Sequence, residues 1–237
     1  MTGKVYLIPT VLHDDDQALN AIPGYVAAAV KLCNSFFVEN ERTARRYLKK
    51  IWKEIVIDDY FWMPIQKVEK ATTDEFIKRL SSGENIAIIS EAGCPGIADP
   101  GQMLVEKAQQ LGATVVPLTG PNSILLALMA SGMNGQHFEF IGYLPIDNSD
   151  RRKALKNLEE ISFKNNKTII FIETPYRNNA LINDVLHQCK HDTKFCIACD
   201  ITSQKETIQT KSIQEWKKSP PDIHKRPAIF LLYAGNL

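Results

Sequence analysis

Short apolar segments alternate with helical segments through the first half of the chain, and this alternation limits the possible folds more than any other feature of the sequence. The strand-like segments are apolar, β-branched or aromatic, and they are Val5–Pro9, Phe36–Val38, Asn85–Ser90 and Thr114–Leu118. The helix-like segments are Arg42–Lys53, Thr73–Leu80, Gln102–Leu111 and the uniformly apolar Ser123–Ala130, which we expect to be buried. Such alternation predicts βαβ units and a largely parallel sheet.

The second half of the chain, after Met133, has a different order of segments. Its strand-like segments are Phe138–Leu144, Thr168–Ile172, Phe195–Ile201, Thr207–Ile213 and Ala228–Tyr233, and its helix-like segments are Arg151–Glu160 and Leu181–Cys189. The last three strands follow one another without helices, which favours antiparallel or mixed pairing. We therefore predict an α/β protein of two α/β domains, residues 1–121 and residues 122–237, with a mixed sheet in the second.

The charge balance excludes several classes of protein. Lys and Arg number 28 and Asp and Glu 27, so bulk charge does not attract nucleic acid, and only a local basic patch can do so. The longest apolar stretches, Ile124–Ala130 and Ala228–Ala234, fall short of the ~20 residues that cross a bilayer. Five cysteines without framework spacing suit a reducing compartment. We expect a cytoplasmic protein with no membrane partner.

The segment from Ser90 to Gly101 is the strongest candidate for a ligand-binding loop. Its sequence, S-E-A-G-C-P-G-I-A-D-P-G, holds three glycines and two prolines, which stiffen the loop and let its backbone approach a ligand closely. It follows a predicted strand and precedes a predicted helix, the position where ligands bind in open α/β sheets. The alternative is a purely structural turn, which ordinarily needs only about two to six residues.

Two further turns join a strand to a helix. In the first, Thr119–Ser123, the side chains of Asn122 and Ser123 either cap the following helix or face a ligand, and spacing alone favours capping. In the second, Glu173–Arg177, a carboxylate and a guanidinium follow a strand end, where a surface ion pair is the commoner arrangement. Three ligand-suited turns in one chain nevertheless favour a binding site.

Other kinds of site have little support in the sequence. Neither G-x-G-x-x-G nor the P-loop pattern occurs, so an ordinary nucleotide-binding loop is not indicated. The spacings His187-x-Cys189-x-His191 and Cys196-x-x-Cys199 invite a zinc hypothesis. However, Phe195–Ile201 is a predicted strand and Cys is commonly buried, so we expect no metal site.

At the three turns the sequence resembles the tetrapyrrole methylase superfamily of S-adenosylmethionine-dependent methyltransferases. The likeness extends from Lys4 to Trp216, and it is closest to the branch that methylates the ribose 2′-hydroxyl of a cytidine in small-subunit ribosomal RNA. The Ser90–Gly101 loop is similar to the branch's S-D-A-G-x-P-x-I-S-D-P-G. The other matching segments are Val116–Ser123, Gly142–Pro145 and Phe171–Arg177.

The resemblance implies a cofactor, an acceptor and an assembly. S-adenosylmethionine is expected in a cleft between the two domains, the acceptor is expected to be RNA or the small ribosomal subunit, and the protein is expected to form a homodimer. The family's cofactor-binding positions fall at Pro9, Ala92, Gly93, Cys94, Ile97, Asn122, Ser123, Thr174 (or Glu173) and Ala228.

Transfer of a methyl group to a ribose hydroxyl also requires a base that takes the hydroxyl proton. Glu39 and Glu173 are the candidates, with Arg42 and Arg177 placed to hold phosphate or carboxylate. The alternative for each glutamate is a structural ion pair with a nearby arginine. We expect Glu39, Glu173 and Arg177 to be the catalytic residues.

A basic stripe on the predicted helix 42–53 is the candidate RNA-binding surface. Its members recur at helical spacing and are Arg42, Arg45, Arg46, Lys49, Lys50 and Lys53. Side chains so arranged can follow a phosphate backbone, although an ordinary solvated helix face has the same pattern. Arg151–Lys153 offers a second, weaker patch.

The sequence also departs from the ribosomal-RNA branch. The branch's P-T-P-I-G-N-L turn is replaced by Pro9–Asp15 with the sequence P-T-V-L-H-D-D, and its A-E-D-T-R is replaced by V-E-N-E-R at Val38–Arg42. These changes lie on the acceptor side. Two alternatives therefore stay open: a methyltransferase acting on a small-molecule or tetrapyrrole acceptor, and a non-catalytic protein that binds S-adenosylmethionine.

Overall fold

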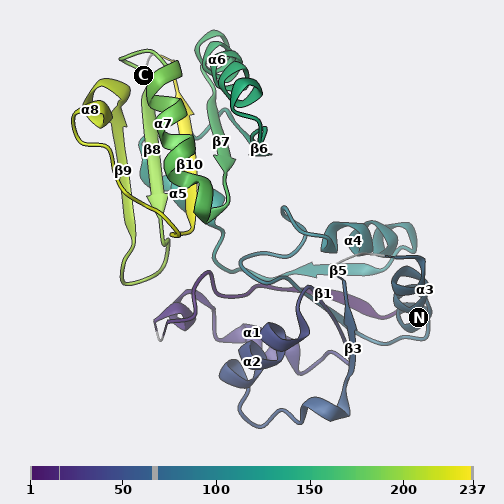
Figure 1. The fold of residues 1–237 in the computed structure, drawn as a ribbon. Coiled ribbons are helices and arrows are strands. Elements are labelled where there is room, and N and C mark those ends of the chain that lie inside the picture. Colours follow the sequence, from purple (N-terminus) through teal and green to yellow (C-terminus); the bar gives the residue numbers. More distant parts are fainter. Residues whose placement is uncertain (1, 16, 66–68, 236–237) are drawn as a thin grey trace. The chain divides into compact units, whose positions relative to one another are not determined.

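The computed structural model describes residues 2–15, 17–65 and 69–235. In it the chain divides into two compact units, Met1–Asn122 and Ser123–Leu237 (Figure 1). Each unit is built on its own five-stranded sheet. Within the described ranges, no helix combines the length and the apolar character needed to span a membrane.

The first unit has a fully parallel sheet. Its strands are β1 (Lys4–Ile8), β2 (Ser35–Val38), β3 (Phe61–Pro64), β4 (Ile86–Ile89) and β5 (Thr114–Pro117), hydrogen-bonded in the order β3-β2-β4-β1-β5. Every neighbouring pair is parallel, as the alternating pattern predicts. Strand β3 is not among the strands expected from the sequence, because a strand of four residues that ends in proline carries little signal.

Helices cover both faces of this parallel sheet. They are α1 (Tyr25–Val30), α2 (Glu41–Ile51), α3 (Lys70–Ser81) and α4 (Gly101–Gln110), with short 3-10 helices η1 (Ala18–Ala21) and η2 (Ile57–Asp59). Ile8 of β1 packs with Leu48 of α2 and with α1, whereas Val5 packs with Phe76 of α3 and with α4. Side chains alternate along a strand, so β1 is buried on both faces and its sequence is continuously apolar.

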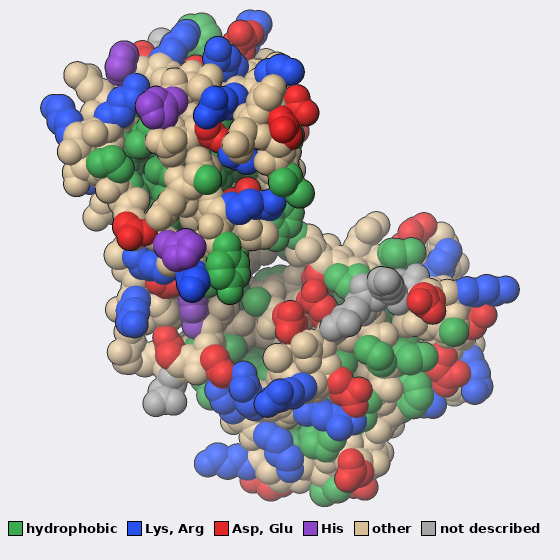
Figure 2. Space-filling model, viewed as in Figure 1, with side chains coloured by type: hydrophobic (Ala, Val, Ile, Leu, Met, Phe, Trp, Pro, Cys, Tyr) green, Lys and Arg blue, Asp and Glu red, His purple; other side chains and the backbone are tan. Residues whose placement is uncertain are grey.

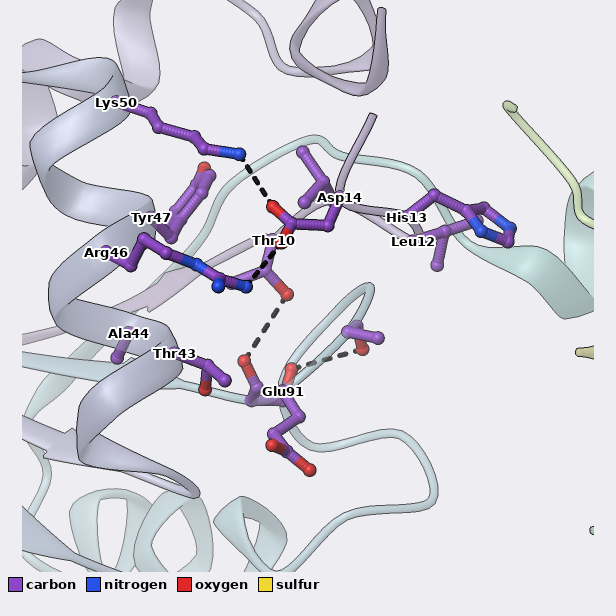
Figure 3. A pocket seen from close by; sticks show the side chains of 13 residues that line it. Thr10, Leu12, His13, Asp14, Thr43, Ala44, Arg46, Tyr47, Lys50 and Glu91 are labelled. Atoms are coloured by element: carbon purple, nitrogen blue, oxygen red, sulfur yellow. Dashed lines mark hydrogen bonds and ion pairs between the residues drawn. The ribbon is translucent and has the colours of Figure 1, made fainter. Parts of the chain in front are cut away.

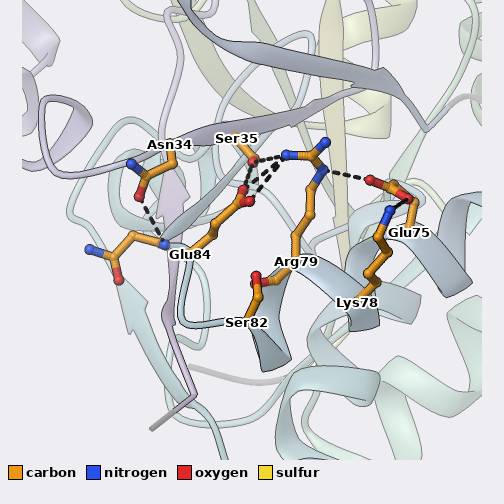
Figure 4. Close-up of polar contacts among 8 residues, drawn as sticks. Asn34, Ser35, Glu75, Lys78, Arg79, Ser82 and Glu84 are labelled. Atoms are coloured by element: carbon orange, nitrogen blue, oxygen red, sulfur yellow. Dashed lines mark hydrogen bonds and ion pairs between the residues drawn. The ribbon is translucent and has the colours of Figure 1, made fainter.

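A polar cluster lies at the amino ends of β2 and β4, and its charged side chains form ion pairs with one another (Figure 4). The Glu84 carboxylate accepts a hydrogen bond from Ser35 Oγ at 2.5 Å and from Arg79 Nη1 at 3.0 Å. Arg79 also donates to Glu75 at 2.7 Å, and its guanidinium lies 3.5 Å from the centre of the Phe61 ring. This cluster fastens α3 to the sheet, and it leaves the opposite, carboxyl edge of the sheet for a ligand.

The second unit has a mixed sheet, as predicted. Its strands are β6 (Phe138–Tyr143), β7 (Thr168–Ile172), β8 (Lys194–Cys199), β9 (Thr207–Ser212) and β10 (Ala228–Tyr233), in the order β6-β7-β10-β8-β9. Only the β6–β7 pair is parallel; β7–β10, β10–β8 and β8–β9 are antiparallel. The antiparallel pairing follows from the order of the segments, because β8 and β9 are consecutive and only a six-residue helix, α8 (Ile213–Lys218), lies between β9 and β10. The expectation that no helix separates these strands is therefore wrong for β9 and β10.

The helices of the second unit are α5 (Ser123–Ser131), α6 (Asn148–Asn165), η3 (Pro175–Arg177), α7 (Asn178–Gln188) and α8 (Ile213–Lys218). Leu155 of α6, Val185 of α7 and Trp216 of α8 share one hydrophobic core with Phe171 and Phe230 of the sheet. A buried salt bridge joins α6 to α7: Arg151 Nη2 lies 2.5 Å from Asp184 Oδ2, and both side chains are almost fully buried.

Helix α5 differs in part from the sequence-based expectation. It packs on β9 and β10, and Thr210 Oγ1 donates to the Ser131 carbonyl at 2.7 Å. Ala127 is fully buried, but Leu125 is 47% and Met129 79% exposed. The expectation of a helix buried all round is therefore wrong, because one side of α5 does not face the sheet.

Candidate active site

The Ser90–Gly101 loop begins at the carboxyl end of β4 and ends at the first residue of α4. Asp99 braces it from within, since Oδ2 accepts a hydrogen bond from Gly96 N at 2.8 Å and Oδ1 one from Gly101 N at 2.7 Å. Burial raises the pKa of Asp99 above its ordinary value and outweighs these two bonds. The Asp99 carboxylate thus holds the loop from inside. Ala92 and Ile97 are exposed on the outer side of the loop.

The turns after β1 and β5 are joined to this loop. Thr10 N donates to the Gly93 carbonyl at 2.8 Å, and Thr10 Oγ1 donates to the Ser90 carbonyl at 3.3 Å. Gly93 has φ +76°, a conformation that favours glycine. Gly120 packs so closely on Pro9 that a Cβ there would lie 2.1 Å from the Pro9 Cβ. The structure therefore brings the first two predicted ligand turns, and the turn after β1, to one edge of the sheet.

Cys94 lies half-buried under these turns. Its Sγ is 3.7 Å from the Gly120 carbonyl oxygen and 3.6 Å from that of Pro121. Burial raises the pKa of the Cys94 thiol, although a hydrogen bond with the Asn122 side chain acts in the opposite direction. The thiol is therefore protonated near neutral pH, which suits packing against a ligand rather than nucleophilic attack.

Glu39 is half-buried just beyond the carboxyl end of β2. Its Oε2 accepts a hydrogen bond from Glu91 N at 2.8 Å, so this carboxylate holds the start of the Ser90–Gly101 loop. The structural alternative for Glu39 was an ion pair with a nearby arginine, and the described part of the chain contains no such pair. Arg42 is exposed at the start of α2.

A pocket of about 180 Å³ opens between the turn after β1, α2 and the loop after β4 (Figure 3). Its lining residues are Thr10, Val11, Leu12, His13, Asp14, Thr43, Ala44, Arg46, Tyr47, Lys50, Ser90, Glu91 and Ala92. The Tyr47 hydroxyl donates to the Pro9 carbonyl at 2.7 Å and ties α2 to the turn. Burial raises the pKa of Tyr47, so the hydroxyl stays protonated.

At the mouth of this pocket α2 presents two cations to one carboxylate. Arg46 Nη2 lies 2.5 Å from Asp14 Oδ2, and Lys50 Nζ lies 2.6 Å from Asp14 Oδ1. Hydrogen bonding from Lys50, together with the charges of both cations, lowers the pKa of Asp14 and outweighs the opposing effect of burial. Asp14 is therefore ionised at neutral pH.

The predicted basic stripe does lie on α2, and in Figure 2 Lys and Arg side chains gather where Figure 1 draws this helix. Its members are not equally available. Arg45 pairs with Glu41 and lies 5.1 Å from the centre of the Trp62 ring. Lys49 Nζ donates to the Ile55 carbonyl. Lys53 follows the end of the helix at Ile51, so the expectation that it continues the helical face is wrong.

In the second unit, Glu173 and Thr174 follow the carboxyl end of β7. The Glu173 side chain is almost fully buried; its Oε1 accepts hydrogen bonds from Thr174 N at 2.6 Å and from Arg177 Nη2 at 2.6 Å. The alternative interpretation of Glu173, an ion pair with arginine, is therefore present in the fold. Its other oxygen, Oε2, is buried and has no hydrogen-bond partner among the described residues.

Ala228 begins β10 beside this turn, because Ile229 pairs with Ile172 at the end of β7. Ser123 is the first residue of α5. Within the second unit the predicted residues Glu173, Thr174, Arg177 and Ala228 thus lie together at one end of the sheet.

The zinc spacings do not form a site in the described part of the chain, where no group of three or more His, Cys, Asp and Glu residues is placed to hold a metal ion. Cys196 and Cys199 are buried in β8. Burial raises the pKa of each to about 11.

Comparison with known proteins places the chain in a family. A model of the tetrapyrrole (corrin/porphyrin) methylases matches residues 9–217. The chain belongs to the tetrapyrrole methylase family. This methylase is 31% identical over 238 residues to ribosomal RNA small subunit methyltransferase I of Buchnera aphidicola, a match that covers 99% of the chain and 79% of the relative.

Two further comparisons agree. The methylase is 35% identical over 170 residues to the Vibrio cholerae protein of the same name, across 70% of the chain but only 57% of that relative. The crystal structure of a uroporphyrin-III C-methyltransferase from Thermus thermophilus, complexed with S-adenosylhomocysteine, matches with a TM-score of 0.58 at 13% identity, covering 98% of the chain and 97% of the other. At that identity the likeness concerns the fold alone. The predicted family and the α/β fold class are confirmed.

Some residues that form the pocket of this methylase have no clear signal in its sequence. Thr10, Asp14 and Tyr47 each contribute a contact that shapes the pocket. Their partners lie 32 or more residues away in the chain, so no local spacing signals them. The only hint is that three consecutive aspartates, Asp14–Asp16, precede a strongly basic helix.

Proposed function

We propose that this methylase transfers a methyl group from S-adenosylmethionine to the ribose 2′-hydroxyl of a cytidine in small-subunit ribosomal RNA. The observation that carries the proposal is the pocket beside the Ser90–Gly101 loop, because it joins the predicted cofactor loop to the exposed cations of α2. Proteins named ribosomal RNA small subunit methyltransferase I are among its relatives at 31% and 35% identity. A cytoplasmic location is part of the same proposal.

The chain offers suitable groups for the cofactor. The small, exposed Ala92 leaves the loop open on its outer side, and Ile97 provides an exposed apolar side chain for an aromatic ring. The unsatisfied Oε2 of Glu173 is suited to accept a hydrogen bond from a hydroxyl or amino group. Bound S-adenosylmethionine supplies an electrophilic methyl group on a sulfonium. The remaining predicted contacts, Pro9, Cys94, Asn122, Ser123, Thr174 and Ala228, stay proposals, as does the cofactor cleft.

The rest of the mechanism requires positioning and removal of one proton. Arg46 and Lys50 would hold the acceptor strand, and the Ser90–Gly101 loop would hold the methyl donor in line with the hydroxyl and exclude water. Glu39 is our proposed base. Its Oε2 is fixed by Glu91 N, and Oε1 has no hydrogen bond to any described residue, so that oxygen can accept the hydroxyl proton. Glu173 and Arg177 are proposed to position the ligand.

We also propose that the protein forms a homodimer. Large apolar side chains such as Met129 and Ile146 are exposed in the second unit, at 79% and 72%, and a protein contact would cover them. Light scattering coupled to size-exclusion chromatography gives the mass directly, and a monomer at micromolar concentration would contradict this part of the proposal.

The principal experiment has two stages. Calorimetric titration with S-adenosylhomocysteine tests the cofactor site, and incubation with labelled S-adenosylmethionine and small ribosomal subunits that lack their 2′-O-methylation tests the acceptor. We expect micromolar binding and label at one ribosomal position. Binding of S-adenosylhomocysteine without methyl label in the ribosomal RNA would favour a small-molecule acceptor. No binding of S-adenosylhomocysteine would favour a protein without methyltransferase activity.

A further inference from the structure

The contact between Asp14 and the two cations of α2 has the geometry of an occupied anion site. The two carboxylate oxygens contact one cation each, Arg46 at 2.5 Å and Lys50 at 2.6 Å. These side chains are four residues apart and share one face of α2. A phosphodiester presents two anionic oxygens in a similar arrangement, and Arg and Lys bind it by the same charge-assisted hydrogen bonds.

The contact is exposed, and this makes it exchangeable. The Asp14, Arg46 and Lys50 side chains are 55%, 58% and 37% exposed. An ion pair between exposed side chains contributes little to stability, so an incoming anion can replace the carboxylate at small cost. Two cations contact one carboxylate, so these three side chains together carry a net positive charge in the free protein.

The position of the contact connects it with the proposed chemistry. Arg46, Lys50 and Asp14 line the same pocket as Ser90, Glu91 and Ala92 of the predicted cofactor loop (Figure 3). Asp14 belongs to the turn after β1, whose start is pinned to that loop by the Thr10–Gly93 backbone hydrogen bond. A strand held by Arg46 and Lys50 would thus pass the mouth of the pocket.

We propose that Arg46 and Lys50 form a phosphodiester-binding site for the acceptor RNA, and that Asp14 occupies this site in the free protein and is displaced when the strand binds. This inference rests on the proposed function, because it assumes an RNA acceptor. In this proposal Asp14 does not help to hold the substrate. Asp14 competes with the substrate, and RNA binding is weaker than the cations alone would allow.

The test measures binding of a fluorescein-labelled RNA hairpin of mixed sequence by anisotropy, over a series of KCl concentrations, for the full chain and its variants. Asp14→Asn removes the competing charge and keeps the size of the side chain. We expect it to tighten RNA binding by about three- to tenfold at low salt. We also expect the slope of the logarithm of the binding constant against the logarithm of the KCl concentration to become more negative by about 1, since a salt ion in place of the carboxylate is then released from the cations when RNA binds. Asp14→Ala gives the same result if the charge is the cause.

Two controls separate competition from general repulsion. Glu54→Gln removes a charge from an exposed side chain beyond the end of α2, outside the pocket, and we expect less than a twofold effect. In an Arg46→Gln/Lys50→Gln background we expect Asp14→Asn to have no effect, because the site for which Asp14 competes is gone. An equal gain in that background, or with Glu54→Gln, would overturn the proposal.

The remaining outcomes are also decisive. Weaker or unchanged binding by Asp14→Asn, while the wild type binds the hairpin, overturns this inference and leaves the proposed function intact. No RNA binding by the wild type or by any variant overturns the RNA acceptor itself. Cytidine monophosphate serves as a second probe, and an Asp14→Asn gain with this nucleotide but not with the hairpin would identify a free-nucleotide site instead of a strand site.

Discussion

The backbone of Thr10 is hydrogen-bonded to that of Gly93, with Thr10 N 2.8 Å from the Gly93 carbonyl oxygen. This one contact ties the turn after β1 to the loop after β4, and those strands are neighbours in the sheet. It fixes the wall of the pocket in which Asp14, Arg46 and Lys50 meet the predicted cofactor loop. The altered sequence of the first turn has therefore kept a defined connection to the candidate active site.

Ala92 and Gly93 are adjacent, but we expect large side chains to act differently at the two positions. Ala92 is exposed, so Ala92→Trp fills the outer side of the loop, lowers S-adenosylhomocysteine affinity about 100-fold or more, and changes stability by less than ~0.5 kcal/mol. Gly93 has φ +76° and a Cβ there would lie 3.3 Å from Leu12, so Gly93→Trp destabilises the fold as well. Calorimetric titration and thermal unfolding measure both effects. Full affinity in a folded Ala92→Trp protein would show that the cofactor lies elsewhere.

Glu39 has two proposed tasks that substitutions can separate. Glu39→Gln keeps an oxygen that accepts from Glu91 N, so cofactor affinity should stay within about twofold while turnover falls about 100-fold through loss of the base. Glu39→Ala also removes the acceptor for Glu91 N and should weaken cofactor binding. Single-turnover methyl transfer and titration with S-adenosylhomocysteine report the two tasks. Wild-type turnover by Glu39→Gln would leave Glu39 only its structural contact.

Asp184 should make the stability of the second unit dependent on pH. Burial acts to raise the pKa of Asp184, but hydrogen bonds and charge from Arg152 and Arg151 outweigh it and hold the pKa below its ordinary value. A carboxyl group with a lowered pKa in the folded state adds stability above its unfolded pKa of about 3.9, and this stability is lost as pH falls through the lower folded value. Asp184→Asn should cost about 3 kcal/mol at pH 7, since it leaves Arg151 buried without its counter-ion.

Calorimetric unfolding of the full chain at pH 7 and at acid pH measures this effect. The difference between wild type and Asp184→Asn should shrink as the pH falls below 4. Asp150→Asn, which removes an exposed partner of Lys153, is the matched control and should shift stability by less than ~1 kcal/mol. A pH-independent difference at position 184 would mean that the pair is not the source of the lost stability.

Cys94 should report occupancy of the cofactor loop. It is half-buried, whereas the other four cysteines are buried, so iodoacetamide should modify Cys94 first. Because burial raises its pKa, the reaction should be slow at pH 7 and should keep accelerating with pH beyond the ordinary thiol pKa of about 8.5. S-adenosylhomocysteine should slow it further. Mass spectrometry of the digested protein gives the rate at each cysteine, and a rate at Cys94 unaffected by the cofactor analogue would place that residue outside the site.

The strongly patterned parts of this fold could be predicted without its structure. Val5, Phe76 and Leu104 are buried on one face of the first sheet and Ile8 and Leu48 on the other, and a strand buried on both sides must be continuously apolar. By contrast β3, with four residues ending at Pro64, and α1, with six residues, are too short to give a clear period. Met129 could not be assigned to the exposed side of α5, because an apolar sequence does not indicate which side lacks a neighbour.

The sequence alone determined the α/β class and the three turns where a ligand was to be sought, because strand periodicity and loop composition are local properties of the chain. The family was indicated separately, by motifs that resemble those of the tetrapyrrole methylases. Only the tertiary structure decided which side chains from other segments lie beside those turns and which of them contact one another. It paired Glu39 with the Glu91 amide instead of with an arginine, and it placed Asp14 on Arg46 and Lys50. Such contacts depend on the order of strands in the sheet, which brings distant segments to one edge, and a one-dimensional pattern does not contain that order.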